Sequence, residues 1–169
     1  MNRTLAIIKP DAVSHPIVLN MVGDIIINSG FNISRACRTK LSQNQAEQLY
    51  SVHVGKFFYD RLITFMTSGP VLAMELQSGN EKNDVISEWR NLLGPSKLYA
   101  NFMKYSSIPH ESKPLRNRFA ISDTRNLAHG SDSPEEVLRE IAVFEPLLKP
   151  ISDPYKLFEL PNELKAITD

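Results

Sequence analysis

The sequence predicts an α/β fold, a ferredoxin-like sandwich in which helices pack on a four-stranded antiparallel sheet. Apolar runs of strand length alternate with segments of helical periodicity, in the order strand, helix, strand, helix pair, strand, helix, long loop, strand and helix. This order suits the split β-α-β units of the ferredoxin-like fold. At 169 residues, 42% of them hydrophobic, the chain is long enough to bury the core of one such domain.

The first half of the chain contains clear helix and strand boundaries. Pro10 cannot extend a sheet ladder, so it ends the first strand, and Gly30 is a typical helix stop. Ser42 and Gln45 stand three apart, which is the capping-box pattern of a helix start. We therefore expect strands over 3–8 and 31–41, with Cys37 in the second, and helices over 16–29 and from 42 to about 52.

The second half is predicted with the same signals. Ser68-Gly69-Pro70 is a turn followed by an apolar run, and Gly94-Pro95 stops a helix. We expect a helical patch around 62–66, a third strand to 76, a helix over 84–93, a long loop over 94–116, a fourth strand near 119–121 or inside 124–133, and a helix from Ser133. The prolines after residue 145 favour a tail, so we expect one domain over 1–145 and a tail over 146–169 that packs on it or extends from it.

Composition excludes several classes of protein. Lys plus Arg and Asp plus Glu both number 19, so no net charge indicates a nucleic-acid partner or an anionic membrane. No apolar run approaches the ~18 residues of a membrane span, and the few residues before the first strand are too short for a presequence. Cys37 stands alone, so no intramolecular disulfide forms and no Cys/His cluster suggests zinc. We expect a cytoplasmic location, and mitochondrial import remains open.

A polar stretch over 124–133 leads into the last predicted helix. Ser133 and Glu136 have capping-box spacing and Pro134 takes the first helical position, so His129 lies just before a helix N-terminus, where anions are favoured. Glu140 lies on the flank of the apolar stripe and leans back toward His129 and Ser131. On these features alone, both a structural and a catalytic histidine remain open.

The stretch 126–132, which reads Asn-Leu-Ala-His-Gly-Ser-Asp, matches the Asn-x-x-His-Gly-Ser-Asp signature of the nucleoside diphosphate kinases. The resemblance spans about residues 4–144 and looks closest to the divergent branch of the family called nucleoside diphosphate kinase 6. It implies an enzyme that transfers the γ-phosphate of ATP to nucleoside diphosphates through a phosphohistidine, in a ping-pong reaction. It also implies the ferredoxin-like fold.

The same resemblance assigns a site residue by residue. It implies that the catalytic residues are His129, Glu140, Ser131 and Tyr50, and that the nucleotide-binding residues are Lys9, Phe58, Leu62, Arg90, Ser96, Arg116 and Asn126. The other histidines, His15, His53 and His110, have no motif support. The sequence shows no carboxylate cage for a metal, so we expect Mg²⁺ to arrive on the nucleotide phosphates.

Several positions depart from the family pattern. Lys56 stands where the family commonly has Arg, and Asp123 stands where typical members carry an apolar residue against the base. The connection 77–83 and the loop 94–116 both look longer than usual, and the corresponding loop carries subunit contacts in hexameric members. The aromatic and basic segment 97–105 is either a surface for a homo-oligomer or protein partner, or a loop packed on its own domain. The alternative function is therefore a weakly active or inactive member that acts mainly by binding a partner.

Overall fold

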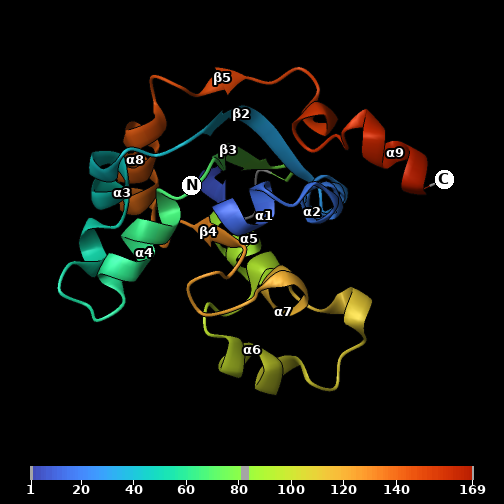
Figure 1. The fold of residues 1–169 in the computed structure, drawn as a ribbon, viewed down its shortest axis with the longest axis horizontal. Helices are drawn as coiled ribbons and strands as arrows, with labels where there is room; N and C mark the ends of the chain where they lie inside the picture. The colour runs from blue at the N-terminus through green and yellow to red at the C-terminus, as the bar shows by residue number, and fades with distance from the viewer. Residues whose placement is uncertain (1, 81–83, 169) are drawn as a thin grey trace.

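The computed structural model describes residues 2–80 and 84–168, which form a mixed α/β fold around one antiparallel sheet (Figure 1). In this part of the chain the sheet order is β4-β1-β3-β2-β5. The strands are β1 (Arg3–Ile8), β2 (Phe31–Thr39), β3 (Val71–Ser78), β4 (Ala128–Gly130) and β5 (Lys149–Pro150). The fold class predicted from the sequence is confirmed, but the prediction of four strands is wrong, since the described residues form five.

The fifth strand comes from the predicted tail. Lys149 and Pro150 pair with Ala36 and Arg35 at the edge of β2. A strand of two residues shows no alternating pattern in the sequence, and Pro150 disfavours a strand because it has no backbone N–H to donate. The strand β5 is therefore apparent only from its pairing with β2. The fourth strand lies inside the signature, as one of the two predicted alternatives had it. The other alternative, near 119–121, is wrong, because α7 ends at Phe119.

The helices of the described residues cover both faces of the sheet (Figure 1). They are α1 (Pro10–Val13), α2 (Pro16–Asn28), α3 (Gln43–Leu49), α4 (Tyr59–Met66), α5 (Val85–Leu93), α6 (Leu98–Tyr105), α7 (Leu115–Phe119), α8 (Pro134–Phe144) and α9 (Asn162–Thr168), with 3-10 turns η1 (Ser51–His53), η2 (His110–Ser112) and η3 (Pro154–Leu157). None of these helices is long and apolar enough to cross a membrane.

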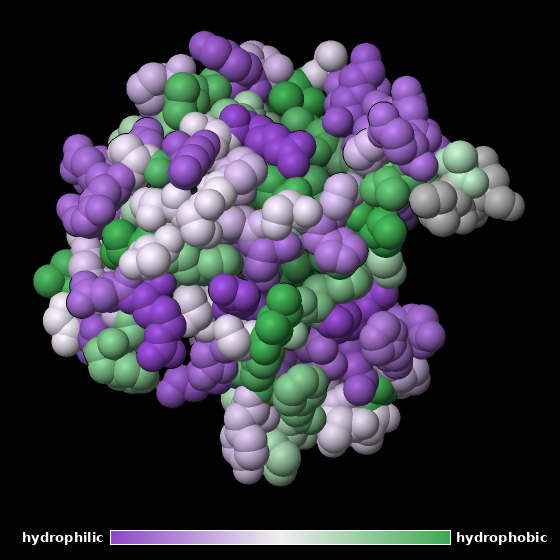
Figure 2. Space-filling model, viewed as in Figure 1, coloured by the Kyte–Doolittle hydropathy of each residue, from purple (hydrophilic) through white to green (hydrophobic). Residues whose placement is uncertain are grey.

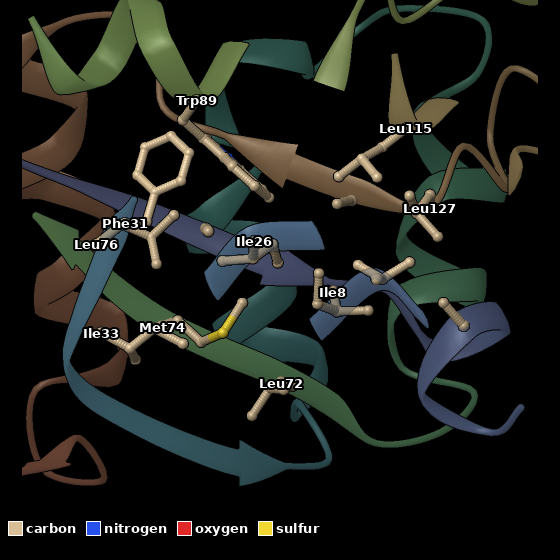
Figure 3. Packing of buried hydrophobic residues seen from close by; sticks show 14 of the residues in the cluster. Ile8, Ile26, Phe31, Ile33, Leu72, Met74, Leu76, Trp89, Leu115 and Leu127 are labelled. Atoms are coloured by element: carbon tan, nitrogen blue, oxygen red, sulfur yellow. The ribbon is translucent and has the colours of Figure 1, made fainter. Parts of the chain in front are cut away.

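Alternation along β1 divides the core into two layers. Ile8 points to the face covered by α2 and α5, where it packs in one cluster with Ile26 and Trp89 (Figure 3). Ile7 points to the other face, where Phe144 of α8 lies in a second cluster with side chains of α3 and α4. Because both faces of β1 are buried, the strand reads as a continuous apolar run.

Two predicted segments differ from the structure in their detail. The helix predicted to reach about residue 52 ends at Leu49, and Tyr50 turns the chain into η1. The loop predicted over 94–116 contains α6 and the start of α7. The prediction that 77–83 is unusually long concerns a connection whose residues 81–83 lie outside the described residues.

The segment carrying α6 projects away from the sheet, and hydrophobic atoms lie on this projection (Figures 1 and 2). Asn101 anchors it, since this residue is fully buried and its Nδ2 donates to the Pro95 carbonyl at 2.9 Å. The opposite face carries Tyr99, Phe102 and Met103, whose exposed fractions are 77%, 53% and 64%. The segment thus packs on its own domain through one face and leaves an apolar face open.

Residues after β5 return to the domain through Phe158. This side chain is 2% exposed and belongs to the core cluster that contains α2. It fills the space above Gly23, where an added Cβ would lie 2.1 Å from the Phe158 ring. Asn20 Nδ2 also donates to the Phe158 carbonyl at 3.0 Å. The tail is therefore held on α2 by both apolar packing and a hydrogen bond.

Candidate active site

A cavity of about 460 Å³ lies where the end of β1, the C-terminal end of α5, α4 and the signature stretch meet. Nine of the eleven predicted site residues line it: Lys9, Tyr50, Phe58, Leu62, Arg90, Ser96, Arg116, Asn126 and His129. The remaining two, Ser131 and Glu140, lie behind His129 and are hydrogen-bonded as described below. The fold thus brings residues from five separate segments of the chain together.

His129 is held by its backbone in the middle of β4. It pairs opposite Ile7 of β1, and its carbonyl accepts a hydrogen bond from Trp89 Nε1 at 3.2 Å. The next residue must be small, because a Cβ on Gly130 would lie 2.6 Å from Cδ1 of the buried Trp89. The indole therefore packs directly against the strand and fixes the position of the histidine.

The imidazole of His129 is oriented from behind by one buried carboxylate. Glu140 is 3% exposed, and its Oε2 lies 2.9 Å from His129 Nε2. The same oxygen accepts a hydrogen bond from the fully buried Ser131 hydroxyl at 2.5 Å. A carboxylate accepts hydrogen bonds, so the arrangement favours a proton on Nε2 and leaves the lone pair on Nδ1. Such a nitrogen is a nucleophile.

Aromatic rings form one wall of the cavity. The Tyr50 ring meets the His129 ring edge-on, with centroids 5.6 Å apart, and stacks on His53 at 6.1 Å. His53 in turn meets Phe58 edge-on at 5.4 Å. Tyr50 Oη is buried and has no hydrogen-bond partner among the described residues. Burial raises the pKa of this phenol, so it stays a neutral donor that a ligand oxygen can satisfy.

His53 is a lining residue that the sequence analysis missed. Burial, and then the neighbouring His129, lower its pKa below the usual value for histidine. The signal available in the sequence was its spacing of three residues from Tyr50, which places both rings on one side of the turn η1. That signal becomes meaningful only once Tyr50 is known to face a cavity.

Lys9 is buried at the end of β1, and its ammonium group faces the cavity. Nζ donates to Asn126 Oδ1 at 2.7 Å and to the Thr124 carbonyl at 3.2 Å. Desolvation by burial, followed by the charge of Arg116, lowers the pKa of Lys9 to about 7. The charge of Asp11 opposes this shift, but among the described residues no carboxylate forms an ion pair with Lys9, so the group is a ready partner for an anion.

The two arginines of the cavity are held differently. Arg116 donates to the carbonyls of Gly94 and Ala128, at 2.9 Å and 2.7 Å, and burial lowers its pKa to about 10. Arg90 is exposed and forms an ion pair with Asp132. Arg116 is thus fixed in place, whereas Arg90 is able to exchange a solvent-exposed carboxylate for another anion.

The backbone between Asn126 and His129 carries local strain. Leu127 has φ of 79°, and Ala128 N donates to the Asn126 carbonyl at 3.0 Å, which is the geometry of a γ-turn. The Leu127 side chain is fully buried, and its carbonyl accepts from Lys9 N at 2.9 Å. Packing and hydrogen bonds therefore hold a conformation that an isolated leucine disfavours. The turn aims the Asn126 side chain at Lys9.

Cations and neutral donors dominate the lining, and these groups fit phosphate oxygens. Among the described residues no cluster of three or more His, Cys, Asp or Glu side chains is arranged to hold a metal ion. Lys9, Arg90 and Arg116 in the lining offer positive charge to phosphate oxygens, so the cavity fits phosphates that would themselves carry a divalent cation.

A comparison with models of protein families shows which family this chain belongs to. A model of the nucleoside diphosphate kinase family matches residues 2–147, which include every residue of the cavity. The chain belongs to the nucleoside diphosphate kinase family. The prediction of this family from the signature is confirmed.

Individual relatives agree with the family match. The chain is 41% identical over 144 residues to nucleoside diphosphate kinase 6 of Mus musculus, covering 85% of this chain and 70% of that protein. It is 37% identical over 147 residues to a nucleoside diphosphate kinase of Histophilus somni, covering 85% and 92%. The crystal structure of the Aquifex aeolicus nucleoside diphosphate kinase superposes with a TM-score of 0.72 at 30% identity, covering 85% and 94%. The chain is thus a family member close to nucleoside diphosphate kinase 6.

Proposed function

We propose that this chain transfers the γ-phosphoryl group of ATP to nucleoside diphosphates through a phosphorylated His129. The observation that carries the proposal is the contact of Glu140 with His129 Nε2 at 2.9 Å, which leaves Nδ1 as the nucleophile in a cavity lined by cations. Membership of the nucleoside diphosphate kinase family supports the same chemistry.

In the first half-reaction the Nδ1 lone pair of His129 attacks the γ-phosphorus. The bond between that phosphorus and the β-γ bridging oxygen breaks, its electron pair goes to ADP, and ADP leaves. The second half-reaction is the reverse, with a different nucleoside diphosphate as the attacking group. Because the two nucleotides use one site in turn, the protein carries the phosphoryl group covalently between them.

The cavity residues position the nucleotide and balance charge during transfer. Lys9, Arg90 and Arg116 offset the negative oxygens, while the hydroxyls of Tyr50 and Ser96 and the amide of Asn126 act as neutral partners of sugar and phosphate. Mg²⁺ coordinated by the phosphates would neutralise further charge on the transferring group. Glu140 keeps the imidazole in the tautomer that attacks and stabilises the positive charge that develops on the ring.

The opposite end of the cavity suits the base. Phe58 and Leu62 offer an aromatic ring and an apolar side chain to a planar group, and stacking on such surfaces accepts purines and pyrimidines alike. Phe57, which is 91% exposed, lies at the rim. We therefore propose that several nucleoside diphosphates serve as acceptors.

A second candidate function is partner binding with weak or absent phosphotransfer. The apolar face formed by Tyr99, Phe102 and Met103 favours it, because three large side chains at helical spacing remain exposed there. The arrangement of side chains around His129 supports phosphotransfer and does not itself favour partner binding.

Phosphoenzyme formation with γ-labelled ATP tests the proposal. We expect acid-labile label on the purified wild-type chain, none on His129→Asn, and normal labelling on the control His110→Asn, which changes an exposed histidine outside the cavity. Conversion of GDP to GTP by the labelled protein completes the cycle. Persistent labelling of His129→Asn at wild-type stoichiometry would overturn the assignment, and absence of label on the wild type would favour the partner-binding candidate.

A further inference from the structure

Arg139 connects α8 to the C-terminal end of α3, which lies beside it (Figure 1). Its Nη1 donates to the Gln48 carbonyl at 2.6 Å, and its Nη2 donates to the Leu49 carbonyl at 3.1 Å. The last carbonyls of a helix have no partner inside the helix, and the negative end of the helix dipole favours a cation there. The guanidinium therefore closes the end of α3 from a neighbouring helix.

The guanidinium of Arg139 is fixed in its plane by further contacts. Nη1 also donates to Ser51 Oγ at 3.3 Å, and Nε and Nη2 donate to the two carboxylate oxygens of Glu136 at 3.1 Å and 2.6 Å. A guanidinium has five N–H donors in a rigid fork, and these contacts together with the two carbonyls use all five. Arg139 is thus held in one orientation, although 31% of its side chain is exposed.

The same guanidinium faces the carboxylate that orients His129. Nη2 of Arg139 lies 3.6 Å from Glu140 Oε1, which is the oxygen that neither His129 nor Ser131 contacts. At this distance the contact is an ion pair without a hydrogen bond. Glu140 is only 3% exposed, and a buried carboxylate is stabilised by an opposite charge nearby. Arg139 therefore balances the charge of Glu140 through the oxygen that the imidazole leaves free.

Tyr50 gives Arg139 a second connection to His129. Tyr50 directly follows Leu49, whose carbonyl Arg139 binds, and its ring meets the His129 ring edge-on with centroids 5.6 Å apart. Among the described residues that line the cavity Arg139 is absent, so it reaches the imidazole only through Glu140 and through the backbone that carries Tyr50. Both contacts of the histidine thus depend on one guanidinium outside the cavity.

We propose that Arg139 is a positioning residue for phosphotransfer, which holds the imidazole of His129 and the ring of Tyr50 in the arrangement that attack requires. The role rests on the proposed function, since it presupposes that His129 attacks phosphorus. A small displacement of a reacting group costs much of its rate, whereas a residue that touches no nucleotide leaves nucleotide affinity unchanged. A purely structural bridge between α3 and α8 would instead change stability and leave the rate of transfer unchanged.

Rapid-quench labelling with saturating γ-labelled MgATP, combined with calorimetric binding of MgADP, tests this role. Arg139→Met removes the charge and all five donors, so the labelling rate should fall by about tenfold or more, with the Kd for MgADP within about twofold of wild type. Arg139→Lys restores the charge but not the planar fork, so its rate should lie between those of Arg139→Met and wild type. Glu136→Gln keeps an amide oxygen as acceptor and both carbonyl contacts, so it should leave Arg139 in place.

Arg35 provides a matched control for the loss of a structural arginine. Its guanidinium pairs with Glu145, which follows the other end of α8, at 2.8 Å, and with the buried Glu75 of β3 at 2.7 Å. Arg35→Met weakens the compensation of a buried carboxylate, so it should lower the unfolding free energy at least as much as Arg139→Met. Because neither ion pair of Arg35 involves Glu140, the labelling rate of Arg35→Met should stay within about twofold of wild type.

The outcomes separate the two proposals. A wild-type labelling rate in Arg139→Met, or equal slowing in Arg35→Met, would overturn the positioning role and leave phosphotransfer standing. A loss of MgADP affinity as large as the loss of rate would assign Arg139 to nucleotide binding and would also overturn it. Should Arg139→Met fail to fold, a wild-type rate in Arg139→Lys would overturn the role of the fork. Absence of label on the wild-type chain would overturn both proposals.

Discussion

Glu140 Oε2 lies 2.5 Å from Ser131 Oγ and 2.9 Å from His129 Nε2, so a single buried oxygen orients both side chains. A neutral amide in its place keeps the shape but loses the charge that holds the Nε2 proton. We expect Glu140→Gln to slow phosphorylation of His129 by roughly 10- to 100-fold, by analogy with carboxylates that orient metal-ligating histidines. Rapid-quench labelling with γ-labelled ATP measures this rate.

A matched control exists on the same helix. Glu136 faces Arg139 at the surface of α8, so Glu136→Gln should leave the labelling rate within about twofold of wild type. ADP affinity of Glu140→Gln should also stay close to wild type, because the change lies behind the imidazole. Equal labelling rates in Glu140→Gln and wild type would show that His129 needs no orientation by the carboxylate.

Lys9 gives nucleotide binding a pH dependence of definite sign. Its pKa is about 7 in the free protein, and phosphates raise this pKa by favouring the charged form. Between pH 7 and the higher pKa of the complex, binding takes up a proton, so affinity for MgADP falls as pH rises, by at most about tenfold per pH unit. Below about pH 7 Lys9 is charged in both states and this dependence disappears.

Calorimetry in two buffers of different ionisation heat measures the proton uptake directly at pH 8. The variant Lys9→Arg stays charged across this range, so its affinity should be flat between pH 7 and 9. A wild-type affinity that is constant from pH 7 to 9, with no proton uptake, would show that Lys9 is already charged in the empty site.

Gly130 is the residue that lets Trp89 pack against the histidine strand. An added Cβ would meet Cδ1 of the fully buried indole at 2.6 Å, so Gly130→Ala must displace Trp89 and, with it, the hydrogen bond to the His129 carbonyl. We expect a loss of about 1–3 kcal/mol in unfolding free energy, measured by denaturant titration. Phosphorylation should slow as well.

Gly69→Ala is the corresponding control, because a Cβ at that position has an ordinary contact of 3.6 Å with Pro10. Its stability should remain within about 0.5 kcal/mol of wild type. If Gly130→Ala were as stable and as active as Gly69→Ala, the contact between Trp89 and the strand would have no role in placing His129.

The exposed apolar face of α6 leads to a prediction about how many copies of the chain assemble. The family resemblance leads us to expect subunit contacts at this loop, and large exposed side chains such as Tyr99, Phe102 and Met103 are difficult to fit into a packed symmetric interface. We expect the purified chain to form an assembly smaller than a hexamer at micromolar concentration, measured by light scattering. Replacing the three exposed residues by Ser, with the buried Asn101 retained, should leave the fold intact. A stable hexamer that the triple variant does not change would show that α6 is a passive surface helix.

Phe158 tests the proposed division into a domain over 1–145 and a tail that packs on it. Its side chain is buried above Gly23, so Phe158→Ala should cost about 3–5 kcal/mol in unfolding free energy. Tyr155→Ala, at a 56% exposed position three residues earlier, should cost less than about 1 kcal/mol. Equal stability of the two variants in denaturant would mean that the tail is an independent extension.

Local signals in the sequence predicted the elements that depend on neighbours in the chain. The strand over 3–8 agrees with β1, and Ser42 and Gln45 form the predicted capping box at the start of α3. The Ser133 side chain accepts a hydrogen bond from Glu136 N as expected, and the Glu136 side chain accepts a hydrogen bond from Arg139. The two capping contacts join residues three apart, so spacing alone reveals them. The strand β1 is revealed by its continuous apolar run, although its pairing partners are distant in the chain.

The family signature predicted the group of residues around His129, but not how they are held. The strained turn at Leu127 depends on packing from several sides, and the hydrogen bond from Leu98 N to Asp123 joins segments that are distant in the chain. The same holds for β5, whose two residues form a strand only because the edge of β2 offers unpaired backbone groups. Helical periodicity predicted that Glu140 leans toward His129 and Ser131, as the hydrogen bonds show. Periodicity carries no information about partners that are distant in the chain, so the orientation of the other site residues emerged only from the folded chain.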